Sequence, residues 1–159
     1  MRTLLVCAVI ALIAVAGRAS VASAADSDPI VGTWQLNASK STFSAGPAIR
    51  NQTRTYSQAG DKITLVMTTT GADGKEVTTH TTYQLNGKDY PVTGTPDYDS
   101  LAAKRIDNNT AEFILKKGGK EIGTTSRTVS KDGRTLTTKI ETTGASGQKT
   151  DNVMVFDRK

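Results

Sequence analysis

Pairs of turn-forming residues recur along the chain at short intervals. They fall at Gly60-Asp61, Asp73-Gly74, Asn86-Gly87, Asn108-Asn109, Gly118-Gly119, Asp132-Gly133 and Ser146-Gly147. Asn-Gly, Asp-Gly and Gly-Gly pairs favour the positive φ angles that tight hairpins require. A series of this kind predicts an antiparallel meander of short strands rather than βαβ units.

The segments between these turns alternate apolar with polar residues. Ile63, Leu65 and Met67 share one face of their segment, as do Phe113 and Leu115 of theirs. Because side chains repeat every second residue in a strand, each strand has one apolar and one polar face. We expect strands at 32–36, 50–56, 62–69, 76–85, 88–92, 100–106, 110–117, 120–129, 134–142 and 150–158.

A sheet of this many strands tends to curl or close, because closure removes exposed edges. Helical periodicity is absent after the first residues, except for one turn near 38–43. We therefore predict an all-β fold, an antiparallel up-and-down β-barrel or strongly curled sheet of about 8–10 strands.

Residues 1–24 have the pattern of a secretory signal peptide. Arg2 precedes an apolar run over 4–16, and small residues then lead to Ala22-Ser23-Ala24. The apolar run is about 13 residues long, whereas a membrane span needs roughly 20. We expect cleavage before Ala25, or before Asp26, leaving one domain over 25–159 in the periplasm or outside the cell, without a membrane span.

The composition of the remaining chain restricts its chemistry. The only cysteine, Cys7, lies in the apolar run, so the domain has no disulfide and no thiolate. Removing Arg2 and Arg18 lowers the formal net charge from +5 to about +3, because no acid is lost with them. The charges that remain are interspersed, whereas nucleic-acid binding needs a clustered basic stripe. We expect a monomer that binds no nucleic acid.

The domain opens with Ile30-Val31-Gly32-Thr33-Trp34-Gln35-Leu36. This stretch resembles the Gly-x-Trp start of the calycin superfamily, the lipocalins and fatty-acid-binding proteins, whose Trp plugs one end of a barrel. The segments 60–65, 130–136 and 153–158 are similar to hairpins and the last strand of the fatty-acid-binding group. The stretch 86–94 resembles one found in small exported bacterial lipocalin-like proteins of unassigned function. The resemblance covers nearly the whole domain and implies a calycin-like barrel.

The chain departs from the fatty-acid-binding pattern at two places. The segment 37–51 is too short, and too broken by Gly46-Pro47, for a two-helix lid. The resemblance implies that Arg127 holds a ligand carboxylate, but Met154-Val155-Phe156 stands where the family has Arg-x-Tyr. Half of the anion clamp is missing, so a fatty acid is not the expected ligand.

A closed barrel of this size can hold one small molecule in its interior. Arg105 and Arg127 are candidates for a buried cation, because a ligand carboxylate would offset the desolvation of a guanidinium. The ordinary alternative for each is a guanidinium that reaches water or pairs with an acid. The candidate cavity residues are Trp34, Met67, Tyr83, Tyr90, Arg105, Phe113 and Arg127. Trp34 also has a purely structural interpretation as the closure of one barrel end.

No set of residues indicates an enzyme, a metal or a cofactor. His80 is the only histidine and shares a polar face, so neither a zinc site nor a serine triad can be assembled around it. Asp97-Tyr98-Asp99 offers oxygen atoms to calcium, but it lacks the glycine and later Glu of a recognised loop and is an ordinary turn. Paired carboxylates cannot be singled out by spacing. We predict no catalytic residues.

Two functions stay open. The first is an exported, non-enzymatic protein that binds a small apolar or amphipathic molecule inside the barrel. The second is an envelope or secreted interaction protein that uses its loops, with a solid core and no ligand. A cavity would favour the first function, and a filled interior would favour the second.

Overall fold

The computed structural model describes residues 27–44, 49–143, 147 and 149–159. The expected signal peptide lies outside these residues. The elements are β1 (Gly32–Leu36), the 3-10 helix η1 (Ala38–Lys40), β2 (Thr42–Phe43), β3 (Ile49–Ala59), β4 (Lys62–Gly71), β5 (Glu76–Tyr83), β6 (Asn86–Thr93), β7 (Ser100–Arg105), β8 (Thr110–Lys117), β9 (Lys120–Val129), β10 (Thr135–Thr143) and β11 (Lys149–Arg158).

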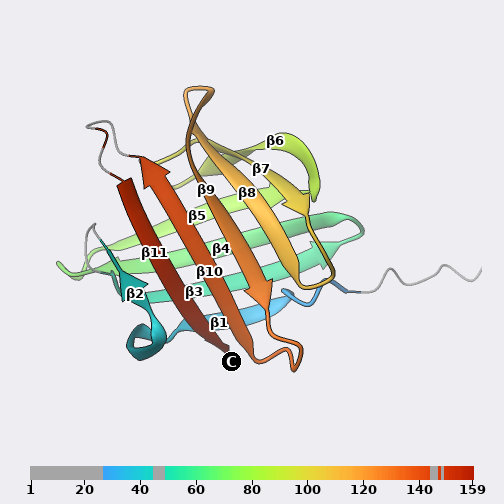
Figure 1. Ribbon diagram of the computed structural model, residues 1–159, viewed down its shortest axis with the longest axis horizontal. Coiled ribbons are helices and arrows are strands. Elements are labelled where there is room, and N and C mark those ends of the chain that lie inside the picture. The colour runs from blue at the N-terminus through green and yellow to red at the C-terminus, as the bar shows by residue number, and fades with distance from the viewer. Residues whose placement is uncertain (1–26, 45–48, 144–146, 148) are drawn as a thin grey trace, which may run out of the picture.

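The strands form a closed antiparallel barrel. Neighbours along the sequence pair with one another from β3 to β11, and β1 pairs with both β3 and β11 to complete the ring. The short strand β2 adds to β11 outside this ring. In Figure 1 the strands β8 to β11 pass in front of β1 and β3 to β5, with the interior between them. The predicted all-β barrel is confirmed, and its ten-stranded ring is calycin-like.

Among the described residues, the strand ends follow the predicted turns with one exception, and Ser146 of the last predicted turn lies outside these residues. Asn86-Gly87 was expected to be a hairpin turn, but β6 begins at Asn86 and the bend falls at Gln84 and Leu85. Gly87 has a φ of 78°, and the β6–β7 register shifts between Asn86 and Asp89. The pair therefore forms a bulge, which uses the same positive φ as a turn. Within the described residues, no helix has the length and apolar character needed to cross a bilayer.

One end of the barrel is closed by a packed plug. Trp34 is fully buried, and its indole N–H donates to the carbonyl of Ile30 at 2.7 Å. The Arg158 guanidinium lies 4.2 Å from the centre of the Trp34 ring. Leu136 and Phe156 are also fully buried in the same core cluster. Trp34 thus has the role that the resemblance implies, closing an end of the barrel.

Candidate functional site

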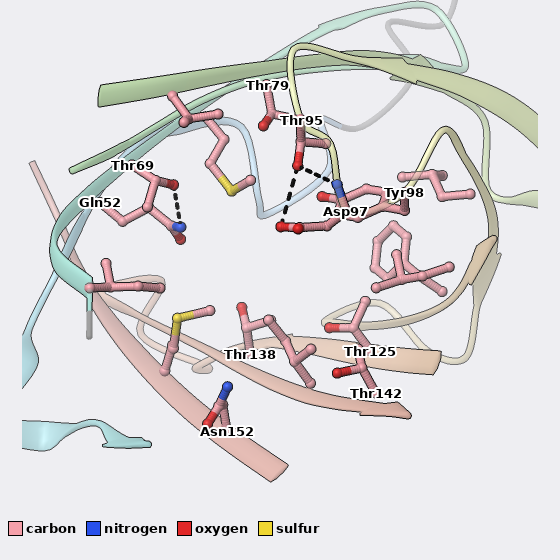
Figure 2. Close-up of a pocket in the computed structure, with 18 of the residues that line it drawn as sticks. Gln52, Thr69, Thr79, Thr95, Asp97, Tyr98, Thr125, Thr138, Thr142 and Asn152 are labelled. Carbon is pink, nitrogen blue, oxygen red and sulfur yellow. Dashed lines mark hydrogen bonds between the residues drawn. The ribbon is translucent and has the colours of Figure 1, made fainter. Parts of the chain in front are cut away.

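The remaining interior holds a cavity of about 860 Å³, shown in Figure 2. This volume lies in the range of small-molecule sites in proteins. Inward-facing residues of β3 to β5 and of β7 to β11 line it, together with the loop before β7. The alternative of a solid core therefore does not describe this barrel.

The floor of the cavity carries the guanidinium of Arg127. Only 3 % of Arg127 is exposed, and the guanidinium lies 5.5 Å from the Tyr56 ring centre and 5.6 Å from that of Phe113. Its Nη2 lies 3.4 Å from Asp28 Oδ2, whereas its buried Nη1 has no hydrogen-bond partner among the described residues. Arg105 donates to the same Oδ2 at 2.7 Å. The Asp28 carboxylate thus accepts from the guanidiniums of both Arg105 and Arg127.

A second unpartnered donor, the hydroxyl of Tyr83, lies close to Arg127. Tyr83 is 1 % exposed, and its hydroxyl makes no hydrogen bond within the described chain. Its ring meets that of Phe113 edge to face, with the centres 5.5 Å apart. Burial raises the pKa of Tyr83, and the positive charge of Arg127 opposes this shift. The hydroxyl therefore keeps its proton near neutral pH and can donate it to a ligand.

Arg54 places a second buried guanidinium against the cavity. Its Nε donates to Gln52 Oε1 at 2.8 Å, and its Nη1 donates across the barrel to Thr138 Oγ1 at 3.0 Å. The guanidinium stacks over Phe156, 4.4 Å from the ring centre. Among the described residues, Arg54 forms no ion pair with an acid. In the part of the chain that the structure describes, the buried cations therefore outnumber the one buried acid, Asp28.

The walls of the cavity mix polar and apolar side chains among register partners on neighbouring strands. Arg54, Met67 and Thr79 are register partners across β3, β4 and β5. On the opposite side the partners are Arg127, Thr138 and Met154, across β9, β10 and β11. All six of these residues line the cavity. Figure 2 shows hydroxyl groups on both of these walls.

The loop between β6 and β7 lies at the mouth of the cavity. Thr95, Asp97 and Tyr98 from this loop line the cavity, and Figure 2 shows them reaching inward. Burial raises the pKa of Tyr98, while Arg54 opposes the shift. Asp99 fixes the end of the loop, because its backbone N–H donates to Lys116 and its carboxylate accepts from Gly118 N at 2.8 Å. The mouth is thus bounded by an anchored segment.

Four of the seven sequence-predicted residues come together in the cavity. They are Met67, Tyr83, Phe113 and Arg127. The other three predicted residues, Trp34, Tyr90 and Arg105, are not among the described residues that line it.

Each of these three has a visible reason for lying elsewhere. Trp34 belongs to the plug, and the Tyr90 hydroxyl donates to Gln84 Oε1 at 2.7 Å. Arg105 has a side chain that is 42 % exposed and pairs with Asp28, as in the ordinary alternative considered for it. Arg105 borders a second, smaller hollow of about 350 Å³ near Gln58 and Gln84.

Sequence reasoning missed Arg54, Tyr56 and Asp28. Gln52, Arg54, Tyr56 and Gln58 alternate along β3, and their mixed polarity conceals an inward face. One signal could have identified Arg54, because it shares a strand face with the aromatic residue Tyr56. Asp28 precedes the first strand, so alternation carries no information on it.

The remaining predicted polar features lie apart from the cavity floor. His80 is exposed on the outer face of β5. Asp97 lines the mouth of the cavity, but Asp99 is bound to Gly118. No cluster of three or more His, Cys, Asp or Glu suited to a metal ion occurs in the part of the chain that the structure describes.

Comparisons with known proteins agree with the fold. No protein family model matches the chain, and no curated protein matches its sequence. Among solved structures, the chain is similar to EF1p2_mFAP2b bound to DFHBI, with a TM-score of 0.51 and 11 % identity over 82 % of this chain and 94 % of that one. It is also similar to mFAP1, a redesigned β-barrel bound to DFHBI, with a TM-score of 0.47, 16 % identity, and coverage of 82 % and 95 %. At these identities the likeness shows the fold alone.

Proposed function

We propose that this protein is a non-enzymatic binding protein that holds an amphipathic small molecule inside its barrel. The acceptor-bearing or anionic end of the ligand meets Arg127 and Tyr83 at the floor, and its apolar part contacts Met67 and Phe113. The similar structure EF1p2_mFAP2b is bound to DFHBI, which supports the proposal in general terms.

The observation that carries the proposal is a pair of buried, unpartnered donors on two residues that line the cavity. Arg127 Nη1 and the Tyr83 hydroxyl are both buried, and neither has a hydrogen-bond partner among the described residues. Buried polar groups in native proteins are paired with few exceptions, and each unpaired group costs about 1–3 kcal/mol. A ligand oxygen that accepts a hydrogen bond from either donor would recover this free energy for that group.

Charge supports an anionic end in particular. Arg54 and Arg127 are buried, and Asp28, the only buried acid among the described residues, is shared with Arg105. An uncompensated buried cation is costly, so an anion in the cavity would stabilise the folded protein as well as bind to it.

We also propose that the protein is exported. The support is the sequence pattern of residues 1–24, with its basic start, apolar run and Ala-x-Ala triplet. Cleavage before Ala25 would place Asp28 close to the start of the mature chain. N-terminal sequencing of the protein recovered from the exported fraction tests this point, since an intact Met1 would contradict it.

Binding is tested with a small amphipathic anion, 1-anilinonaphthalene-8-sulfonate, followed by its fluorescence. Replacing Arg127 by Gln should weaken binding about 10- to 100-fold, because a hydrogen bond to a charged group contributes about 1.5–3 kcal/mol. Arg105→Gln is the matched control. Both arginines donate to Asp28 Oδ2, but only Arg127 lines the cavity.

The control variant should change the affinity less than about threefold. Equal effects of the two substitutions would show that the ion pair with Asp28, and not the cavity, determines binding. Native mass spectrometry of the protein purified from its own exported fraction adds an independent measurement. A bare mass, together with no uptake of the sulfonate or of lipids, would contradict the proposed function.

A further inference from the structure

The cavity has a second chemical property besides its charged floor, namely hydroxyl and amide groups along its walls. Thr79 is buried and lines the cavity, and its Oγ1 makes no hydrogen bond to the described residues. Asn152 lines the opposite wall, where its Oδ1 accepts from Ser44 N and its Nδ2 donates to no described residue. Thr79 lies four residues from Tyr83 along β5, and Asn152 lies on β11.

Two further hydroxyls act only as acceptors in the hydrogen bonds among the described residues. Thr69 Oγ1 accepts from Gln52 Nε2 at 2.7 Å, and Thr138 Oγ1 accepts from Arg54 Nη1 at 3.0 Å. A hydroxyl has one hydrogen to donate in addition to its lone pairs. Thr69 and Thr138 each therefore keep one hydrogen that they can donate into the cavity.

These donors are not gathered on one side. Thr79 stands in register with Met67, and Thr69 stands in register with Val77. Thr138 is the partner of Met154 on the other wall. An alkyl chain running up the cavity would contact a hydroxyl on either wall, and it would displace water from these donors without replacing the hydrogen bonds.

We infer that the ligand is an acceptor-rich, oxygenated amphipathic acid, with ether, carbonyl or hydroxyl oxygens along its body, rather than an acid with a plain hydrocarbon tail. This inference rests on the proposed function and names the ligand class of the same cavity. The anionic end lies at Arg127 and Tyr83, the carbon skeleton contacts Met67 and Met154, and the oxygens of the body accept from Thr79 and Thr138.

The test compares two acids of nearly the same shape. They are cinnamate with three methoxy groups and cinnamate with three ethyl groups at positions 3, 4 and 5, measured by calorimetry on the full mature protein. The wild type should bind the methoxy acid at least about tenfold more tightly, because two or more ether oxygens gain donors. Tighter binding of the ethyl acid, or of dodecanoate, would overturn the inference and leave the proposed function intact.

Thr79→Val removes one wall donor at constant side-chain shape, and no hydrogen bond to the described residues is lost with it. The preference for the methoxy acid should fall about three- to tenfold in this variant. Thr78→Val is the control, since Thr78 is the exposed neighbour on the same strand. An unchanged preference in Thr79→Val would also overturn the inference, whereas a failure of all three acids to bind would overturn the proposed function with it.

Discussion

Arg127 and Asp28 form a buried ion pair in which only one side of the guanidinium is used. Nη2 lies 3.4 Å from Asp28 Oδ2, and Nη1 lies buried without a partner in the described part of the chain. Asp28 in turn accepts from Ile30 N at 2.9 Å, which links the pair to the plug around Trp34. The closed end of the barrel thereby orients the cation that faces the cavity.

Removing the Tyr83 hydroxyl should separate stability from binding. The hydroxyl is buried without a partner, so Tyr83→Phe should raise the free energy of unfolding of the ligand-free protein by about 1 kcal/mol. The same change should weaken binding of the anilinonaphthalene sulfonate severalfold, because a donor is lost. Urea denaturation and fluorescence titration measure the two effects.

Tyr90→Phe is the control, because the Tyr90 hydroxyl donates to Gln84 Oε1 and accepts from Asn86 Nδ2. That variant should lose about 0.5–1.5 kcal/mol and bind the probe as the wild type does. A loss of stability in Tyr83→Phe would mean that the hydroxyl already has a hydrogen-bond partner in the ligand-free protein in solution.

Asp28 should be essential to the stability of the closed end. Asp28→Asn removes the charge that two guanidiniums share, and breaking a buried pair in this way should cost about 3 kcal/mol. Asp157→Asn breaks the exposed pair with Lys40 and should cost less than about 1 kcal/mol. Thermal unfolding with and without the sulfonate probe provides the measurement. The probe should stabilise Asp28→Asn more than the wild type, because the variant has more uncompensated positive charge.

Arg158 should stabilise the plug through its shape as well as its charge. Its three guanidinium nitrogens donate to the carbonyls of Gly133, Val31 and Pro29 at 2.6–2.7 Å. Lysine keeps the charge, but its single ammonium group lacks the planar arrangement of nitrogens that lets Arg158 donate to three carbonyls. Arg158→Lys should therefore lower the free energy of unfolding by about 2 kcal/mol in urea, and Arg134→Lys, an exposed position, should leave it unchanged.

The sequence predicts this fold well because strand alternation and turn chemistry are local signals. Phe113 and Leu115 face inward as their alternation requires, and the expected strands agree with β3 to β11 within a few residues. Asn86-Gly87 was misplaced because a bulge and a hairpin turn use the same positive φ.

The site was predicted only in part, since its polar members depend on long-range partners. Arg105 and Arg127 are equivalent by sequence, and only the three-dimensional position of Asp28 and of the barrel end separates the exposed cation from the buried one. Arg54 donates across the barrel to Thr138, a contact between residues 84 positions apart that no local pattern contains. Alternation therefore identifies which residues face inward, but not how far each lies from the plug.

Gly94 should be required for the loop at the cavity mouth. Its φ is 84°, and a Cβ at this position would collide with the carbonyl oxygen of Thr78. Gly60 has a similar φ of 62° with open space around it. Gly94→Ala should therefore cost clearly more stability than Gly60→Ala, which bears only the backbone strain of about 1 kcal/mol. Equal melting temperatures of the two variants would show that the loop does not pack against β5 in solution.

Acid should weaken the β7–β8 turn through Asp107. Its carboxylate accepts from the backbone N–H groups of Asn109 and Thr110 at 2.8 Å each, and these hydrogen bonds lower the pKa of Asp107 below its ordinary value. A pKa that is lower in the folded state contributes stability above the unfolded pKa of about 3.9, and this contribution disappears as the pH falls through the folded pKa. The stability difference between the wild type and Asp107→Asn should thus be constant above about pH 5 and shrink towards pH 2. A difference that stays constant over this range in urea titrations would show that the ionised carboxylate does not cap the turn, since both proteins gain the same positive charge elsewhere on acidification.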